Sequence, residues 1–505
     1  MRNQRTLRTL AVTLAVFLLT LTSACKVTEA DIENWKETVK GPGKLVAVVL
    51  TPKYSMELRT RAAIALVEME RTDVEGIVEL QHALHRLDEP TRTQLIDAMK
   101  DPLVELMRGG AAQPNAGAPT TAATPLQIRA KDAGFVLITD ASAATRAALT
   151  NAVVGWYVED FNGRALSGKY SAEQVVRQLG APAATVLVSA LNEHMPKEAI
   201  VKLAELIGQL GEAATKTQAA SRLIAIERTM EGDEFLNWVK GKIRAQMTAN
   251  GGQVNEERIT AGAVLNRDTF INDGVIPAMK FLADQAVVAN RLIEIAASAQ
   301  QTETRRTRAL LALEGKATEA QLEALLGIAL DSNTPAPIRD TAFDRIGDVR
   351  STASLARLWP LVTGNDQRLR WRVGELVLGI GGVNVVNDFI TRLPSAPTTE
   401  YAPEELDGYA TRLGQMTPLP TDAMRPQLQS PRWYMRVIAL RFFARKGVAA
   451  DAAAMQALAS DSTAVHGPAN SWPAGATVGR SATEAVTFLN ERLAAPPEPA
   501  AAAAH

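Results

Sequence analysis

Residues 339–361 read RDTAFDRIGDVRSTASLARLWPL, and this stretch carries the pattern that organises much of the chain. Ala342 and Ile346 follow Arg339 at steps of three and four residues, which places both on one stripe of an α-helix with the arginine at its N-terminal end. Gly347-Asp348 then interrupts the helical pattern, and a second apolar series follows at Leu355, Leu358 and Leu361. The stretch therefore predicts two amphipathic helices joined by a turn.

The same arrangement recurs elsewhere in the sequence. Arginines that are followed at the same spacing by two apolar residues occur at Arg59, Arg92, Arg306, Arg339, Arg370 and Arg436. Glycines recur 32 to 34 residues apart at Gly315, Gly347, Gly381, Gly414 and Gly447, and a further pair is Gly180 and Gly211. Because the residue after a helix often takes a positive φ, which glycine tolerates best, we expect these glycines to end helices. A unit of this size cannot bury its apolar stripe alone, so the repetition predicts stacked units.

These residues resemble the HEAT and HEAT-like repeat family, in which two antiparallel helices form a unit and the units stack. The resemblance is clear across 300–460, fair across 45–105 and 171–230, and poor across 231–300. It implies an all-α helical-hairpin solenoid, that is, an α/α superhelix. Because such folds carry many unrelated functions, the resemblance does not identify a ligand.

The composition agrees with an all-α fold. Hydrophobic residues make up 47% of the chain and aromatic residues only 5%, which favours packed helices. Residues 134–139 form the best strand candidate, but we expect them to end a helix, with Asp140 or Ser142 capping the next one. The net charge of −1 argues against a nucleic-acid partner, since nucleic-acid binding requires a basic face.

Cys25 is the only cysteine of the chain, and the residues before it have the features of a secretory signal over 1–24. Arg2, Arg5 and Arg8 precede an apolar run over 10–21, which is shorter than the roughly 20 residues that span a bilayer. The stretch Leu21-Thr22-Ser23-Ala24-Cys25 resembles the lipobox of bacterial lipoproteins, whose cysteine carries the lipid, although the family usually has Leu where Thr22 stands. The alternative is cleavage after Ala24 that leaves a free thiol. Lys26 resembles the sorting signal of outer-membrane lipoproteins, so the resemblance implies a lipid anchor on Cys25 in the bacterial cell envelope.

Changes in composition suggest how the rest of the chain is divided. Residues 25–108 are expected to form an N-terminal helical HEAT-like module, in which Thr28 caps the first helix. The Ala-, Pro- and Gly-rich segment 109–125 is either a flexible linker or a long loop within one stack. Degenerate HEAT-like repeats over 126–300 and regular repeats over 301–493 follow, and the Ala/Pro tail 494–505 is expected to be disordered.

The sequence contains no strong motif for catalysis or for metal binding. We therefore expect no cofactor, no metal site and no enzymatic activity. His82 and His85 lie three residues apart beside Glu79 and Asp88, but one helix supplies too few converging ligands for zinc. The acidic series Asp340, Asp344 and Asp348 is either a solvent-exposed helix face or the acid pair of a glycan-cleaving enzyme.

Two arginine–aromatic clusters provide the best candidates for partner binding. They are Arg370-Trp371-Arg372 and Arg432-Trp433-Tyr434, at the starts of two helices. Arginine, tryptophan and tyrosine are enriched at recognition surfaces, but the tryptophans could equally fill gaps between repeats. We therefore expect a membrane-anchored lipoprotein that acts as a non-enzymatic scaffold for another protein. The alternatives are an all-α cell-envelope enzyme that cleaves glycan or peptide with paired carboxylates, and a non-catalytic binder of peptidoglycan or lipid.

Overall fold

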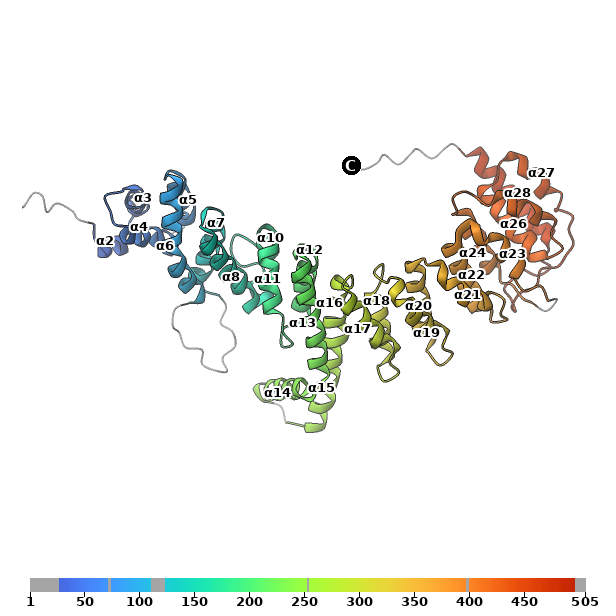
Figure 1. Ribbon diagram of the computed structural model, residues 1–505, viewed down its shortest axis with the longest axis horizontal. Helices are drawn as coiled ribbons and strands as arrows, with labels where there is room; N and C mark the ends of the chain where they lie inside the picture. The colour runs from blue at the N-terminus through green and yellow to red at the C-terminus, as the bar shows by residue number, and fades with distance from the viewer. Residues whose placement is uncertain (1–26, 71–73, 110–122, 252–253, 397–398, 496–505) are drawn as a thin grey trace, which may run out of the picture. The chain divides into compact units, whose positions relative to one another are not determined.

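The computed structural model describes residues 27–70, 74–109, 123–251, 254–396 and 399–495 (Figure 1). The predicted signal segment with Cys25, residues 110–122 of the predicted linker and residues 496–505 of the tail lie outside the described residues. Within those ranges the chain is α-helical, and the β-type pairing is a single isolated bridge between Ala464 and Thr477. The prediction of an all-α fold is confirmed. The chain divides into two compact units, residues 1–282 and 283–505, which are described separately.

The first unit consists of α-helices of 4 to 20 residues, most of which pack against the next helix along the chain. Its elements are α2 (Glu29–Trp35), α3 (Gly41–Leu50), α4 (Met56–Glu68), α5 (Gly76–His85), α6 (Glu89–Arg108), α7 (Pro125–Leu137), η1 (Ile138–Asp140), α8 (Ala143–Glu159), α9 (Phe161–Arg164), α10 (Ala172–Leu179), α11 (Ala181–Ala190), α12 (Lys197–Leu210), α13 (Ala213–Glu231), α14 (Asp233–Ala249), α15 (Glu256–Phe270), η2 (Ile271–Val275), α16 (Ile276–Met279) and η3 (Lys280–Leu282). Helix α4 packs on α6, α6 on α8 and α8 on α11, so the unit has a continuous helical layer.

Local sequence signals set the helix starts as expected. Thr28 accepts a hydrogen bond from the backbone N–H of Asp31, and the Asp31 carboxylate accepts one from the backbone N–H of Thr28, which completes a capping box. Ser142 caps α8, and residues 134–137 end α7 rather than forming a strand. Both sequence expectations are confirmed.

The helices on the two sides of segment 109–125 pack directly against each other. Helix α7 lies against both α6 and α4. The Arg129 Nε–H donates to the carbonyl of Val67 at 3.1 Å, and the Gln127 amide donates to the carbonyl of Met107 at 3.3 Å. The segment thus connects neighbouring helices of one packed unit.

The second unit contains the regular repeats. Its elements are α17 (Ala286–Ala297), α18 (Glu303–Ala312), α19 (Glu319–Leu330), α20 (Ala336–Val349), η4 (Thr352–Ser354), α21 (Leu355–Val362), α22 (Gln367–Gly381), η5 (Gly382–Val385), α23 (Val386–Arg392), α24 (Pro403–Gly414), α25 (Thr421–Met424), η6 (Arg425–Gln429), α26 (Trp433–Lys446), η7 (Ala449–Asp451), α27 (Ala452–Gln456) and α28 (Val478–Ala494). The pairs α17–α18, α19–α20 and α21–α22 are hairpins, and α18, α20, α22, α24, α26 and α28 pack in succession. Helices α20 and α21 are the two that residues 339–361 predict.

The arginine of the repeat motif is a buried residue in four of its six copies, namely Arg59, Arg306, Arg370 and Arg436. The Arg59 Nε–H donates to the carbonyl of Val49 at 2.8 Å, and the Arg306 Nε–H donates to the carbonyl of Ala296 at 2.7 Å. Both carbonyls belong to the last turn of the preceding helix, where no intrahelical donor remains. The arginine therefore satisfies that helix end and places a positive charge at the negative end of its dipole.

The repeated glycines end helices at most positions, as expected: Gly381 and Gly414 are the last residues of α22 and α24, and Gly180, Gly211 and Gly447 directly follow α10, α12 and α26. The positive φ expected at these glycines is rarer. Of the five in the second unit, only Gly315 has a positive φ, of 64°. Gly347 lies inside α20, which ends instead at Arg350 with a φ of 53°. A Cβ on Gly347 would lie 3.0 Å from Leu376 Cδ1, and one on Gly414 would lie 3.2 Å from Lys446 Cγ. Close approach between helices, rather than backbone conformation, explains these two glycines.

One stretch among the described residues, Gln367–Arg392, is long and apolar enough to cross a membrane by length and composition. It comprises α22, η5 and α23, and half of its most apolar window is buried within the protein. Such burial is typical of a core helix, and α22 packs between α20 and α24.

Candidate functional site

Arg370, the first residue of the first predicted cluster, belongs to the core. It is 1% exposed and forms a two-pronged ion pair with Glu405, in which Nε lies 2.8 Å from Oε1 and Nη2 lies 2.9 Å from Oε2. Its Nη2 also donates to the carbonyl of Glu400 at 2.7 Å, and its Cζ lies 4.4 Å from the centre of the Tyr401 ring. Burial raises the pKa of Glu405, while the hydrogen bonds from Arg370 oppose that shift. Arg370 therefore joins α22 to α24 and is inaccessible to a partner.

The other residues of the first cluster are partly exposed. Trp371 is half-buried against α24, where its Nε1 lies close to Gly408. Arg372 is half-exposed and pairs with Asp344 of α20. These two side chains remain available as parts of an interaction surface.

The second predicted cluster lies in an aromatic network. Tyr434 is buried and stacks on Tyr401, with ring centres 4.3 Å apart. Trp433 is half-buried and meets Tyr401, Trp472 and His466 edge-on at 6.0 to 6.2 Å. The Arg432 guanidinium is partly exposed and lies 5.6 Å from the centre of the Tyr434 ring. Two of the six predicted residues, Arg370 and Tyr434, are thus buried in the core. The other four are partly exposed: Trp371, Arg372, Arg432 and Trp433.

The acidic series on α20 pairs with neighbouring basic groups. Asp340 pairs with Arg368 and Asp344 with Arg372, both on α22. Asp348 lies 3.2 Å from Arg345 Nη1 and accepts a hydrogen bond from the backbone N–H of Gly315 at 3.0 Å. Asp340 and Asp344 thus join α20 to α22 through ion pairs. Asp348 joins α20 to the preceding repeat through its hydrogen bond from Gly315.

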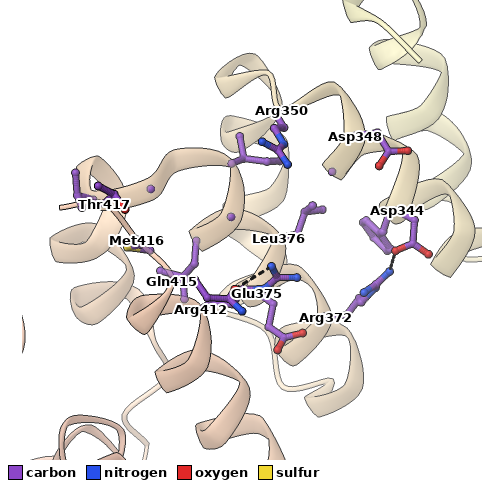
Figure 2. A pocket seen from close by; sticks show the side chains of 17 residues that line it. Asp344, Asp348, Arg350, Arg372, Glu375, Leu376, Arg412, Gln415, Met416 and Thr417 are labelled. Atoms are coloured by element: carbon purple, nitrogen blue, oxygen red, sulfur yellow. Dashed lines mark hydrogen bonds and ion pairs between the residues drawn. The ribbon is translucent and has the colours of Figure 1, made fainter. Parts of the chain in front are cut away.

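A polar cavity of about 420 Å³ lies beside this series, between α20, α22 and the end of α24 (Figure 2). Figure 2 shows the Arg372–Asp344 ion pair on one side of the cavity, and Arg412 and Gln415, which are joined to each other by a hydrogen bond at the end of α24, on the other side. The lining contains as many arginines as carboxylates: Arg350, Arg372 and Arg412 against Asp344, Asp348 and Glu375. This balance of charge favours neither an anionic nor a cationic ligand.

A second cavity, of about 330 Å³, lies between α26, α28 and the segment that precedes α28. We call it the C-terminal groove. Its lining includes Arg441, Arg445, Trp472, Arg480 and Phe488, none of which the sequence identifies as a candidate. The only feature of the sequence that points to this groove is the basic character of α26. The residues that line the groove lie up to 85 positions apart, from Pro403 to Phe488, and no local sequence pattern connects them.

The histidines are dispersed in the structure. His82 and His85 lie on α5, and His85 Nε2 is 3.9 Å from Asp140 Oδ2. His194 lies beside Trp238, with ring centres 4.6 Å apart. Within the described ranges, no group of three or more histidine, cysteine, aspartate or glutamate side chains could hold a metal ion.

No protein-family model and no curated protein matches the chain. Among solved structures, an engineered protein aligns over 89% of this chain and 98% of its own at 15% identity and a TM-score of 0.20. Kap121p bound to Ste12p aligns over 83% of this chain and 46% of its own at 12% identity and a TM-score of 0.28. The chain thus spans less than half the length of the Kap121p chain. The helical-repeat fold is established by the packing of the chain's own helices.

Proposed function

We propose that this chain is a non-enzymatic, HEAT-like scaffold that binds another protein in the bacterial cell envelope. The observation that carries the proposal is the distribution of charged and aromatic side chains in the second unit. Asp340 and Asp344, the acid pair that a glycan-cleaving enzyme would need, are paired with arginines of α22. Glu405, whose pKa burial raises, is 0% exposed and cannot contact a substrate.

Arginine and aromatic side chains that reach solvent, in contrast, occur at several places on the surface of the same unit. Arg372, Arg432 and Trp433 are partly exposed, and Phe488 is 52% exposed. Side chains of these types contribute most of the binding energy at protein interfaces. A stack of helical repeats presents such groups on an extended surface that suits a protein partner better than a small molecule.

Site-specific photo-crosslinking in the protein's own cells tests the proposal. A photoreactive amino acid placed singly at Arg372, Gln415, Arg432 or Phe488 should yield a discrete crosslinked protein at one or more positions. The same strains kept in the dark are the control. If no position gives a crosslinked protein, and the purified chain instead releases soluble fragments from peptidoglycan, the enzymatic alternative replaces the scaffold.

We also propose that a lipid on Cys25 holds the scaffold at the outer membrane. The sequence up to Cys25 supports this proposal, because a short apolar run follows basic residues and is separated from the chain's single cysteine by three small residues. Lipidation is expected to give stable membrane association, which Cys25→Ser should abolish together with acyl labelling. Cell fractionation and metabolic labelling with a fatty-acid analogue measure both effects. The Thr22→Leu variant, which restores the usual lipobox, should remain in the membrane. Unchanged fractionation of Cys25→Ser would contradict the anchor.

A further inference from the structure

The C-terminal groove has one apolar wall that is fixed in place. Trp472 donates its indole N–H to the carbonyl of Tyr401 at 2.8 Å, and its ring meets Trp433 edge-on at 6.2 Å. Phe488 of α28 lines the same groove, and 52% of its surface is exposed to solvent. An aromatic side chain with this exposure beside a rigid indole offers a preformed apolar contact for a ligand.

The other wall carries three guanidinium groups, those of Arg441, Arg445 and Arg480, each of which has a carboxylate beside it. Arg441 and Arg445 share one carboxylate, that of Asp407, and Arg441 Nη1 lies 3.7 Å from it. Burial lowers the pKa of Arg441 and the nearby Arg445 adds to this shift, whereas Asp407, Glu404 and Glu484 oppose it. Arg480 lies at the start of α28, pairs with Glu484 at 3.1 Å and is 54% exposed. The lining therefore holds three guanidinium groups and one carboxylate, Glu484.

Arg441 also connects the two walls. Its Cζ lies 5.5 Å from the centre of the Trp472 ring, and its Nη1 donates to the carbonyl of Pro403. These contacts hold the guanidinium in place, so little conformational entropy is lost when a ligand binds. The groove thus places fixed positive charge directly beside fixed apolar surface.

We infer that the C-terminal groove binds an acidic segment of a partner protein, with an Asp or Glu carboxylate at Arg445 and Arg480 and an adjacent apolar side chain against Trp472 and Phe488. Among the residues that line the groove itself, three guanidinium groups and a single carboxylate supply the charge complementarity for that segment. A cavity of about 330 Å³ accommodates one or two side chains and is far too small for a folded domain. The inference rests on the proposed scaffold function and names the chemistry of its partner.

Other anionic ligands fit the groove less well. Nucleic acid requires a basic face many phosphates long, whereas this basic patch is confined to three arginines and includes Glu484. A free inorganic anion would gain nothing from Trp472 and Phe488. The combination of the two walls favours a ligand that carries a carboxylate and an apolar group side by side.

Selection from a random heptapeptide library on the purified full-length protein tests the inference. Enriched peptides should contain Asp or Glu within two positions of an aliphatic or aromatic residue. Arg445→Ala, Arg480→Ala and Phe488→Ser should each weaken binding of these peptides by about tenfold, as expected for interface residues of this type. Arg357→Ala is the matched control, because Arg357 is an arginine of the same unit that is 53% exposed and pairs with Glu323. Its affinity for the peptides should not change.

A charge exchange makes the experiment specific. The Arg480→Glu variant should no longer bind the acidic peptides. It should instead bind their counterparts in which lysine replaces the acidic residue. Selected peptides without acidic residues, or affinities that Arg445→Ala and Arg480→Ala leave unchanged, would overturn the inference. Binding of phosphatidylglycerol vesicles that depends on these arginines, in the absence of acidic peptides, would also overturn it in favour of a membrane surface. If crosslinked proteins persist in cells while the groove variants leave them unaffected, only the groove is excluded and the scaffold stands.

Discussion

Arg370→Met is expected to destabilise the second unit by about 3–5 kcal/mol, because it leaves the Glu405 carboxylate buried without its partner. Arg370 and Glu405 are 1% and 0% exposed, and the variant also removes the donor to the carbonyl of Glu400. The loss should appear as a lower denaturant midpoint by circular dichroism. Hydrogen–deuterium exchange should show faster amide exchange in α22 and α24.

Arg368→Met on the same helix is the matched control for this effect. The Arg368 side chain is 75% exposed and pairs with Asp340, so its loss should cost less than about 1 kcal/mol. The double variant Arg370→Met/Glu405→Met should recover part of the stability, since neither charge is then left unpaired. Equal effects of Arg370→Met and Arg368→Met would contradict the structural role of the buried pair.

Lys131→Met is expected to destabilise the first unit by a similar amount, about 3–5 kcal/mol. Lys131 is 0% exposed, and its Nζ donates to Asp132 Oδ1, to Tyr157 Oη at 2.8 Å and to the carbonyl of Ser167 at 2.9 Å. Burial lowers the pKa of Lys131, while Asp132 opposes this shift. The variant leaves the buried Asp132 carboxylate without its cation and frees the loop that precedes α10, so exchange should accelerate at Ser167 and in the adjacent loop.

Lys169→Met in the same loop provides the comparison for Lys131. The Lys169 side chain is 53% exposed and pairs with Glu75, so the expected cost is below about 1 kcal/mol. Adding Asp132→Asn to Lys131→Met should restore part of the stability by removing the unpaired charge. An unfolding midpoint for Lys131→Met that matches Lys169→Met would show that the buried ammonium does not hold the loop.

The helices could be predicted from the sequence because their signals are local. The step of three and four residues after Arg339 spans about two turns of a helix, and the capping residues Thr28 and Ser142 each act within one turn. Whether a given arginine is buried or exposed could not be predicted from such local signals. Arg370 is buried because of Glu405, 35 residues later, and nothing near Arg370 indicates that partner.

The candidate site was only partly predictable for the same reason. Trp433 was identified from its neighbours Arg432 and Tyr434, and it supports Trp472 at the C-terminal groove. Trp472 itself lies in an irregular segment, whereas Arg441 and Phe488 lie on different helices. Their proximity depends on the packing of α26 against α28, which the repeat spacing alone does not specify.

Crosslinking to the partner in cells can be compared between two double variants. This comparison distinguishes a scaffold from an enzyme that uses Asp340 and Asp344 as its acid pair. Arg445→Glu/Arg480→Glu reverses the charge of the C-terminal groove, and Asp340→Asn/Asp344→Asn removes the carboxylate pair of α20. With the photoreactive residue at Phe488, the scaffold proposal predicts that the second variant retains the crosslinked protein at the level of the unmodified chain, and the groove inference predicts that the first variant loses it. Loss of the crosslinked protein by the second variant would contradict the scaffold proposal, whereas retention by the first variant would exclude only the groove.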